Sequence, residues 1–135
     1  MKVLLADDDQ DQLELRGLLL STSGFETIEV SDGPSALRAA EAQKPECAVV
    51  DLRFPTEELG LRLIRGLKKM NAAMRVIVLT GADPLRIGRL PEKELVDEII
   101  VKGSSSDQLL RSLKALARTL QRAEGSQRKR LKGAS

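Results

Sequence analysis

The chain has 135 residues, of which 41% are apolar and only two, Phe25 and Phe54, are aromatic. This length suits one domain, whose core must be aliphatic. The chain has no histidine and a single cysteine, Cys47, which excludes Ser/His and Cys/His catalysis, histidine metal sites and an internal disulfide, and favours a reducing, cytoplasmic location. No apolar run approaches the length of a membrane span, so no membrane partner is expected.

The net charge of +2 is distributed unevenly. Residues 122–135 contain five Arg or Lys and one Glu, a net +4, which leaves −2 for residues 1–121. We expect a domain over residues 1–122 and a basic, disordered tail over residues 123–135, because the tail has almost nothing to bury. A weak nonspecific contact of the tail with nucleic acid or a membrane is the alternative to a solvated end. No specific nucleic-acid binding is expected from this chain.

Five short apolar segments have the pattern of β-strands in a sheet covered on both faces. They are residues 3–6, 25–30, 47–50, 76–79 and 98–101. Between and after them, segments with apolar residues at helical spacing predict helices. These segments are residues 11–20, 33–43 and 59–67, one beginning at 84, and 107–120. Strands that alternate with helices predict a parallel (βα)5 sheet with helices on both faces.

The ends of these helices are marked by their own residues. Asp9 or Asp11 is available to cap the first helix, whose leucines are at positions 13, 15, 18 and 19, and residues 104–107 are expected to cap the last one. Pro91 lies inside the fourth expected helix, which begins at Pro84, and should break or restart it near Leu90.

Polar residues follow four of the predicted strands. Asp7 and Asp8 follow the first and Asp51 the third; Thr80, with Gly81, follows the fourth and Lys102 the fifth. The carboxyl ends of parallel strands meet at one edge of a sheet, where ligands bind in α/β folds. Three carboxylates there would repel one another and raise their pKa values, and Mg²⁺ would relieve that repulsion.

A threonine hydroxyl and a lysine ammonium at the same edge suit a phosphoryl group carried by Asp51 as an aspartyl-phosphate. Any one of these residues alone is more typical of a helix cap or a solvated loop. Their conjunction at successive strand ends favours phosphoryl chemistry.

These residues and spacings resemble the receiver domain of response regulators, the CheY-like family of two-component signalling, over residues 2–120. The resemblance implies a flavodoxin-like three-layer (βα)5 sandwich with strand order 2-1-3-4-5. It also implies phosphate transfer from a histidine kinase or a phosphotransfer protein to Asp51. Asp7 and Asp8 would hold Mg²⁺ together with Asp51, with Asp8 as the direct ligand, and the backbone carbonyl of Arg53 would complete the metal site.

By the same resemblance, Thr80 and Gly81 form the phosphate-binding switch, and Lys102 acts with Asp51 as the catalytic pair. The family usually has an aromatic residue where this chain has Ile99, so an aromatic rotamer switch is impossible here. The family usually has a proline after the lysine, where this chain has Gly103, so we expect a trans Lys102–Gly103 peptide bond. The loop after Asp51, taken to include residues 56–60, is one residue longer than the common form.

The predicted function is therefore a phosphoacceptor receiver, not an enzyme beyond self-phosphorylation and autodephosphorylation at Asp51. Its output would be an unknown downstream protein or a homodimer through the fourth helix, fifth strand and last helix. One alternative is a phosphorylation-independent interaction module that uses the same face constitutively. A small phosphohydrolase of similar topology is a second alternative, which the lack of a further general base disfavours.

Overall fold

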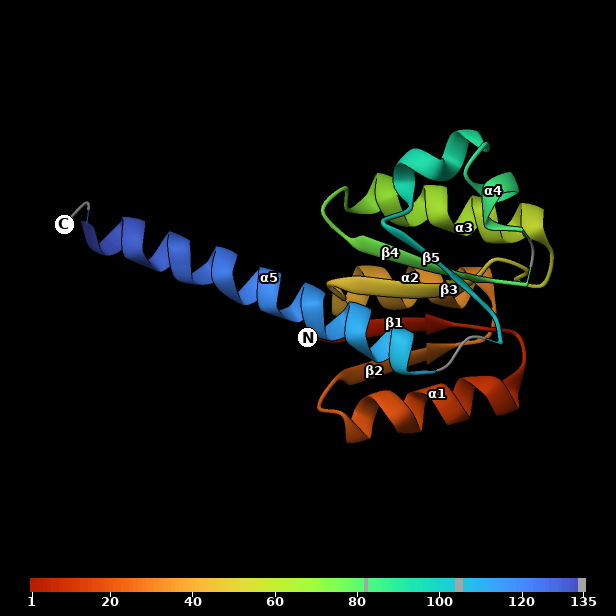
Figure 1. The fold of residues 1–135 in the computed structure, drawn as a ribbon, viewed down its shortest axis with the longest axis horizontal. Helices are drawn as coiled ribbons and strands as arrows, with labels where there is room; N and C mark the ends of the chain where they lie inside the picture. Colours follow the sequence, from red (N-terminus) through yellow and green to blue (C-terminus); the bar gives the residue numbers. More distant parts are fainter. Residues whose placement is uncertain (82, 104–105, 134–135) are drawn as a thin grey trace. The chain divides into compact units, whose positions relative to one another are not determined.

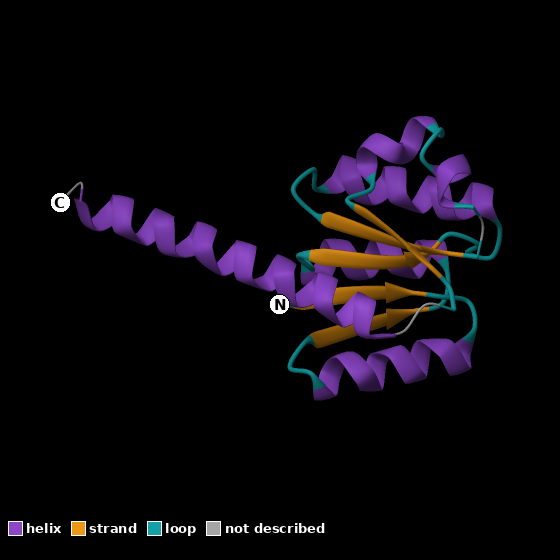
Figure 2. Cartoon of the chain, viewed as in Figure 1, coloured by secondary structure: helices purple, strands orange, loops and turns teal. Residues whose placement is uncertain are grey.

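The computed structural model describes the backbone of residues 1–81, 83–103 and 106–133, with side chains as far as residue 125. The chain forms two compact units, residues 1–104 and 105–135, and each is described by itself. The strands of the first unit are β1 (Lys2–Ala6), β2 (Glu26–Val30), β3 (Cys47–Asp51), β4 (Arg75–Thr80) and β5 (Glu98–Val101). Its helices are α1 (Gln10–Thr22), α2 (Gly33–Gln43), α3 (Glu57–Met70), α4 (Pro84–Ile87) and the 3₁₀ helix η1 (Pro91–Leu95). Figures 1 and 2 show their alternation along the chain.

The five strands form one sheet in the order β2-β1-β3-β4-β5, and all four pairings are parallel. This confirms the (βα)5 topology and the strand order that the resemblance implies. In the register of the sheet, Ala6 lies opposite Val50, and Thr80 lies opposite Val101. The residues that follow these strands therefore leave the sheet at one edge.

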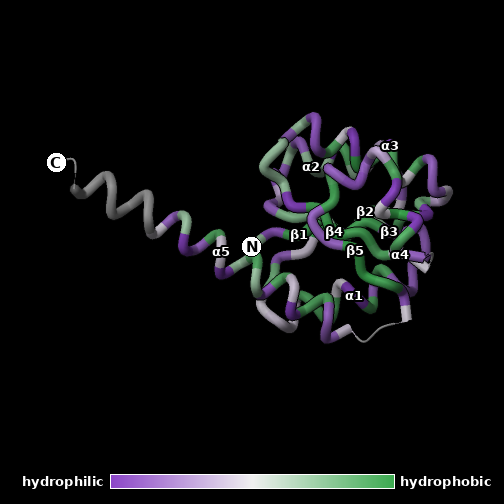
Figure 3. The backbone as a smooth tube through the Cα atoms, turned by 45° about the horizontal axis from the view of Figure 1, so that its top comes forward, coloured by the Kyte–Doolittle hydropathy of each residue, from purple (hydrophilic) through white to green (hydrophobic). Residues whose placement is uncertain are grey.

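Both faces of the sheet are packed, which explains why its strands are so apolar. All five residues of β3 are buried, as expected for the middle of a doubly covered sheet. Alternate strand residues belong to one large core cluster together with residues of α2, α3 and α4. The strand residues of this cluster are Leu4, Ala6, Ile28, Val30, Ala48, Val50, Val76 and Val78. Figure 3 shows the strands as the apolar part of this unit, with polar and apolar residues alternating along its helices.

Side-chain caps begin α1, α2 and α4 where the sequence predicts helix starts, and the caps are Asp9, Asp32 and Asp83. Asp9 accepts hydrogen bonds from the backbone amides of the first turn of α1, and Asp32 does the same for α2. The buried face of α1 consists of Leu13, Gly17 and Leu20, whereas Leu15 and Leu18 lie on the solvent side. The leucines used to predict this helix therefore mark its existence but only part of its buried face.

The loop after β3 is shorter than the sequence suggests. Thr56 caps α3, so residues 57–60, assigned to the loop, form the first turn of the helix instead. A Cβ atom on Gly60 would lie 1.8 Å from the carbonyl oxygen of Leu52, so only glycine permits this approach of helix and loop. The close contact fixes the loop that follows Asp51 against α3.

The segment between β4 and β5 is irregular, as Pro91 predicts. α4 is a helix of only four residues, and Pro91 starts the 3₁₀ helix η1 after Leu90, which has an extended backbone. Ile87 is the buried residue of α4, and no residue of η1 is buried. Leu90, Leu95 and Val96 pack against the core but are only partly buried, so this segment is held by fewer fully buried residues than α3.

The second unit contains the long helix α5 (Ser106–Gly133). Its backbone is helical as far as Gly133, and Gln, Arg and Lys, which dominate residues 127–132, are good helix formers. The division at residue 122 and the disorder of the tail stay predictions. Residues 104 and 105 of the expected cap lie outside the described residues. In the part of the chain that the structure describes, no helix is long and apolar enough to cross a membrane.

Candidate phosphoryl and metal site

The predicted acidic residues meet at the carboxyl edge of the sheet. Asp7 directly follows β1, Asp51 is the last residue of β3, and these two strands are neighbours. One oxygen from each of Asp7, Asp8 and Asp51 can be chosen so that all three lie within 4.8 Å of one another. Asp7 and Asp51 are buried, whereas Asp8 is exposed. The arrangement predicted from strand ends is therefore confirmed as a cluster.

The carboxylate of Asp51 is held by two donors. Its Oδ1 accepts a hydrogen bond from the backbone amide of Arg53 at 3.2 Å, and its Oδ2 accepts one from Lys102 Nζ at 2.5 Å. The carboxylate is only 5% exposed, and this burial raises its pKa above the ordinary aspartate value. Lys102 opposes that rise, while the neighbouring charge of Asp7 adds to it. Lys102 thus supplies a counter-charge to a carboxylate in a place that disfavours charge.

Asp7 is held in the same way. Its Oδ1 accepts the backbone amide of Asp9 at 2.9 Å, and its Oδ2 accepts the guanidinium of Arg16. The Asp7 side chain is 2% exposed and that of Arg16 is 19% exposed. Arg16 is a residue of the site that the sequence does not predict. One feature of the sequence could have identified it: Arg16 precedes Gly17 on the face of α1 that also carries Leu13 and Leu20. A charged residue on a buried helix face needs a buried partner of opposite charge.

Thr80 at the end of β4, Gly81 after it and Lys102 after β5 lie at the same edge. Thr80 is the last residue of β4 and is 3% exposed, and its carbonyl oxygen accepts the backbone amide of Lys102 at 2.7 Å. Lys102 thus joins two strand ends, to Thr80 through its backbone and to Asp51 through its side chain. A Cβ on Gly81 would meet nothing within 4 Å, so the structure gives no steric reason for glycine there.

Two departures from the family pattern can be placed. Ile99 is partly buried and packs against the large core cluster. Gly103 has a φ of 94°, in the left-handed region that favours glycine. The Lys102–Gly103 bond is trans, as predicted, since the cis bond among the described residues is Phe54–Pro55.

The donor set fits a hard divalent cation. Three carboxylates with oxygens in mutual reach suit Mg²⁺, which binds through one or two carboxylates and keeps several waters. Asp8, the exposed member, would offer its oxygens most readily to such an ion. For Arg53, the contact that the structure describes is its amide on Asp51, so the metal-ligand role of its carbonyl stays a prediction.

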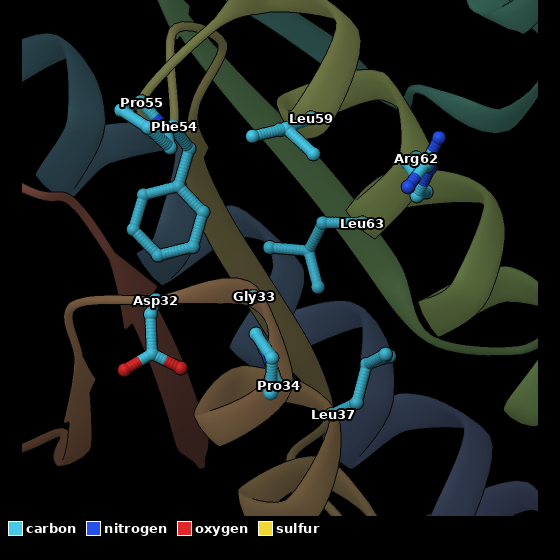
Figure 4. A pocket seen from close by; sticks show the side chains of 9 residues that line it. All are labelled: Asp32, Gly33, Pro34, Leu37, Phe54, Pro55, Leu59, Arg62 and Leu63. Carbon is cyan, nitrogen blue, oxygen red and sulfur yellow. The ribbon is translucent and has the colours of Figure 1, made fainter.

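A separate cavity of about 440 Å³ opens between α2, α3 and the loop after β3. Its lining is mostly apolar, and Figure 4 shows Phe54, Leu59 and Leu63 turned toward the space between the two helices. The carboxylate of Asp32, at its rim, points away from the Phe54 ring and caps α2. The cavity contains none of the predicted site residues, so it is not part of the acidic site.

Comparisons with known proteins agree with this geometry. The family model described as "Response regulator receiver domain" matches residues 3–114. The transcriptional regulatory protein PrrA of Mycobacterium tuberculosis is 32% identical over 119 residues, which cover 87% of this chain and 50% of PrrA. The chain thus spans half or less of the length of the first curated relatives that it matches.

Solved structures show the same fold. The receiver domain of the Francisella response regulator 1452 has a TM-score of 0.79 and 27% identity, covering 88% of this chain and 98% of its own. A CheY-like receiver domain protein from Methanospirillum hungatei has a TM-score of 0.80 and 22% identity, covering 90% and 97%. With a family model that matches most of its length and a fold shared with these domains, the chain belongs to the response regulator receiver domain family.

Proposed function

We propose that Asp51 accepts a phosphoryl group from the phosphohistidine of a histidine kinase or phosphotransfer protein, and that Mg²⁺ is required. The observation that carries the proposal is the buried Asp51 carboxylate, paired with Lys102 and within reach of Asp7 and Asp8 oxygens. An isolated buried carboxylate would be neutral and a poor nucleophile, whereas this one has a fixed cation beside it.

The chemistry follows from these contacts. An oxygen of Asp51 attacks the phosphorus, the bond from phosphorus to the histidine nitrogen breaks, and that nitrogen keeps the electron pair. Lys102, freed from the carboxylate as it becomes an acyl phosphate, can follow the charge onto the phosphoryl oxygens. Mg²⁺ would supply further positive charge to these oxygens when bound. In this proposal Thr80 and Gly81, at the end of β4, contact the phosphoryl group that Asp51 carries.

Hydrolysis of the phosphoaspartate by water would return Asp51 to its starting state, so the chain acts on itself only and turns over no separate substrate. The response would be a change in binding on a surface that includes α4 and β5, to a downstream protein or a second copy of the chain. A cytoplasmic location, where histidine kinases present their phosphohistidine, is part of the proposal. The complete acidic cluster and the Asp51–Lys102 pair support phosphorylation over a constitutive interaction module, which needs neither.

The test is intact mass spectrometry after incubation with acetyl phosphate and Mg²⁺, and separately with a phosphorylated histidine phosphotransfer domain. Wild type should gain one phosphoryl group, and Asp51→Asn should gain none. Asp11→Asn, an exposed aspartate in the first turn of α1, is the matched control and should behave as wild type. If both donors leave wild type unmodified, the phosphoacceptor proposal is wrong and the constitutive module replaces it.

A further inference from the structure

Arg16 is a largely buried cation in direct contact with the acidic cluster. It lies on α1, its side chain is 19% exposed, and its guanidinium donates to Oδ2 of Asp7. A guanidinium keeps its charge at any physiological pH, so this positive charge is permanent. It therefore belongs to the electrostatics of the site, even though α1 supplies no other side chain to it among the contacts described here.

The two buried carboxylates of the cluster have matching partners. Asp7 accepts hydrogen bonds from the backbone amide of Asp9, two residues later in the chain, and from the guanidinium of Arg16. Asp51 accepts hydrogen bonds from the backbone amide of Arg53, also two residues later, and from the ammonium of Lys102. Each buried carboxylate thus already has one fixed counter-charge before any metal arrives. With Asp8, three negative and two positive charges leave the group at a net −1.

We propose that Arg16 is an internal competitor of the divalent cation: it occupies Asp7, stabilises the metal-free site and weakens Mg²⁺ binding. The inference rests on the metal site of the proposed function. Oδ1 of Asp7 already accepts the Asp9 amide and Oδ2 accepts the guanidinium, so a cation drawn to Asp7 must share an oxygen with one of these donors, and at Oδ2 it competes directly with the guanidinium. The guanidinium also repels the incoming ion directly, and this repulsion is poorly screened at a buried site.

The competition gives Arg16 a role in the cycle of the receiver. Without metal, it prevents the repulsion between Asp7 and Asp51 from opening the edge of the sheet. With metal bound, its charge remains close to the phosphoryl site and offsets one of the carboxylates. A receiver built this way fills its metal site only at higher Mg²⁺ concentration than the same site without the arginine.

The test is isothermal calorimetry of Mg²⁺ binding, since the chain has no Trp or Tyr to report by fluorescence. Arg16→Gln should bind Mg²⁺ about tenfold more tightly than wild type, the ratio expected for the loss of one modest charge repulsion. Arg38→Gln is the matched control, because Arg38 is an exposed helical arginine that contacts Ser35 outside the site, and it should bind like wild type. Affinity in Arg16→Gln that is unchanged or weaker than wild type overturns the proposal.

A second measurement uses the wild-type protein, so it does not depend on whether the Arg16→Gln variant folds. In wild type, the guanidinium resonance of Arg16 should shift as Mg²⁺ saturates the site, and an unchanged resonance at saturation overturns the proposal. The outcome is separable from that of the proposed function. Tighter Mg²⁺ binding by Arg16→Gln supports the competition even if Asp51 is never phosphorylated, whereas phosphorylation with no change in affinity supports the receiver chemistry and overturns the role of Arg16.

Discussion

Within residues 1–104, the region around β1 and β3 and the region around β5, at one edge of the sheet, are stabilised in different ways. On the side of β1 and β3, regular strands and full-length helices are held by apolar burial, and all of β3 is buried. On the side of β5, a four-residue α4 and the 3₁₀ helix η1 replace a long helix, and partly buried apolar residues together with ion pairs hold this region against the rest of the unit. These pairs are Arg65–Glu92, Arg86–Glu57 and two from Asp97 to Lys68 and Arg75.

In the proposed function, this difference separates the chemistry from its readout. Asp7 and Asp51 are on the firmly packed side, where the proposed phosphoryl transfer needs fixed positions. Thr80 and Lys102 lie at the border, with Lys102 joined to both sides. The segment between them has few fully buried apolar residues and is expected to open locally at lower cost, which would suit a part that changes in the proposed response.

The largest effect is expected when isoleucine is replaced by alanine in each of the two regions. Ile64 in α3 and Ile87 in α4 belong to the same core cluster and are both buried. Ile64→Ala should lower the free energy of unfolding by about 2–5 kcal/mol, because a regular helix cannot close the cavity. Ile87→Ala should cost at most about 2 kcal/mol, because the short α4 can settle inward.

Urea unfolding followed by circular dichroism measures both variants. Losses of equal size would show that α4 is as rigidly held as α3, and the contrast between the two sides would not hold.

The next effect concerns Cys47 in the packed middle of the sheet. Burial raises the pKa of its thiol to about 12, so the folded protein keeps the thiol neutral where the unfolded chain ionises it. The neutral thiol makes its full contribution to the free energy of unfolding below the ordinary thiol pKa near 8.5. This contribution is lost as the pH rises from there toward about 12. Within that window the loss is at most about 1.4 kcal/mol per pH unit.

The measurement is urea unfolding at pH 8 and pH 10 for wild type and Cys47→Ala. The alanine variant should lose less stability between these two pH values than wild type. Equal losses would mean that the thiol ionises in the folded state as easily as in the unfolded one. Rapid labelling of the native thiol at pH 8 would contradict the burial directly.

The smallest effect tests the ion pairs. Arg65 Nη1 lies 2.7 Å from Glu92 Oε1, with the two side chains 49% and 15% exposed. Glu92→Gln should lower the free energy of unfolding by less than about 1 kcal/mol, and 1 M NaCl should remove most of the difference. Glu41→Gln, at an exposed position of α2, is the control. A loss that persists in high salt would show that Glu92 acts by packing rather than by charge.

Much of this molecule could be read from its sequence, for identifiable reasons. β5 was predicted with its observed bounds, and the acidic cluster followed from aspartates placed directly after apolar strands. These features are local in sequence, and the parallel topology brings them together. The restart at Pro91 was also predictable, because proline removes the hydrogen bond that a helix interior needs.

The features that the sequence does not predict depend on contacts between distant segments or on a balance of weak conformational preferences. The pairing of Arg16 with Asp7 was not predicted, since a helical arginine is ordinarily exposed and its partner lies in another element. The first turn of α3 was assigned to a loop because its acidic start hides the helical pattern, which the Thr56 cap and the fit of Gly60 against Leu52 establish.

The backbone at Gly103 also restricts how this sequence can evolve. Its φ of 94° is closed to proline, whose ring holds φ near −65°. The proline that the family usually has after its lysine therefore cannot return here by one substitution without rerouting the chain beyond Lys102. Glycine and this path of the backbone therefore depend on each other: the left-handed φ favours glycine, and glycine permits the φ. Relatives that have Lys-Gly at this position should share the backbone path as well as the residue.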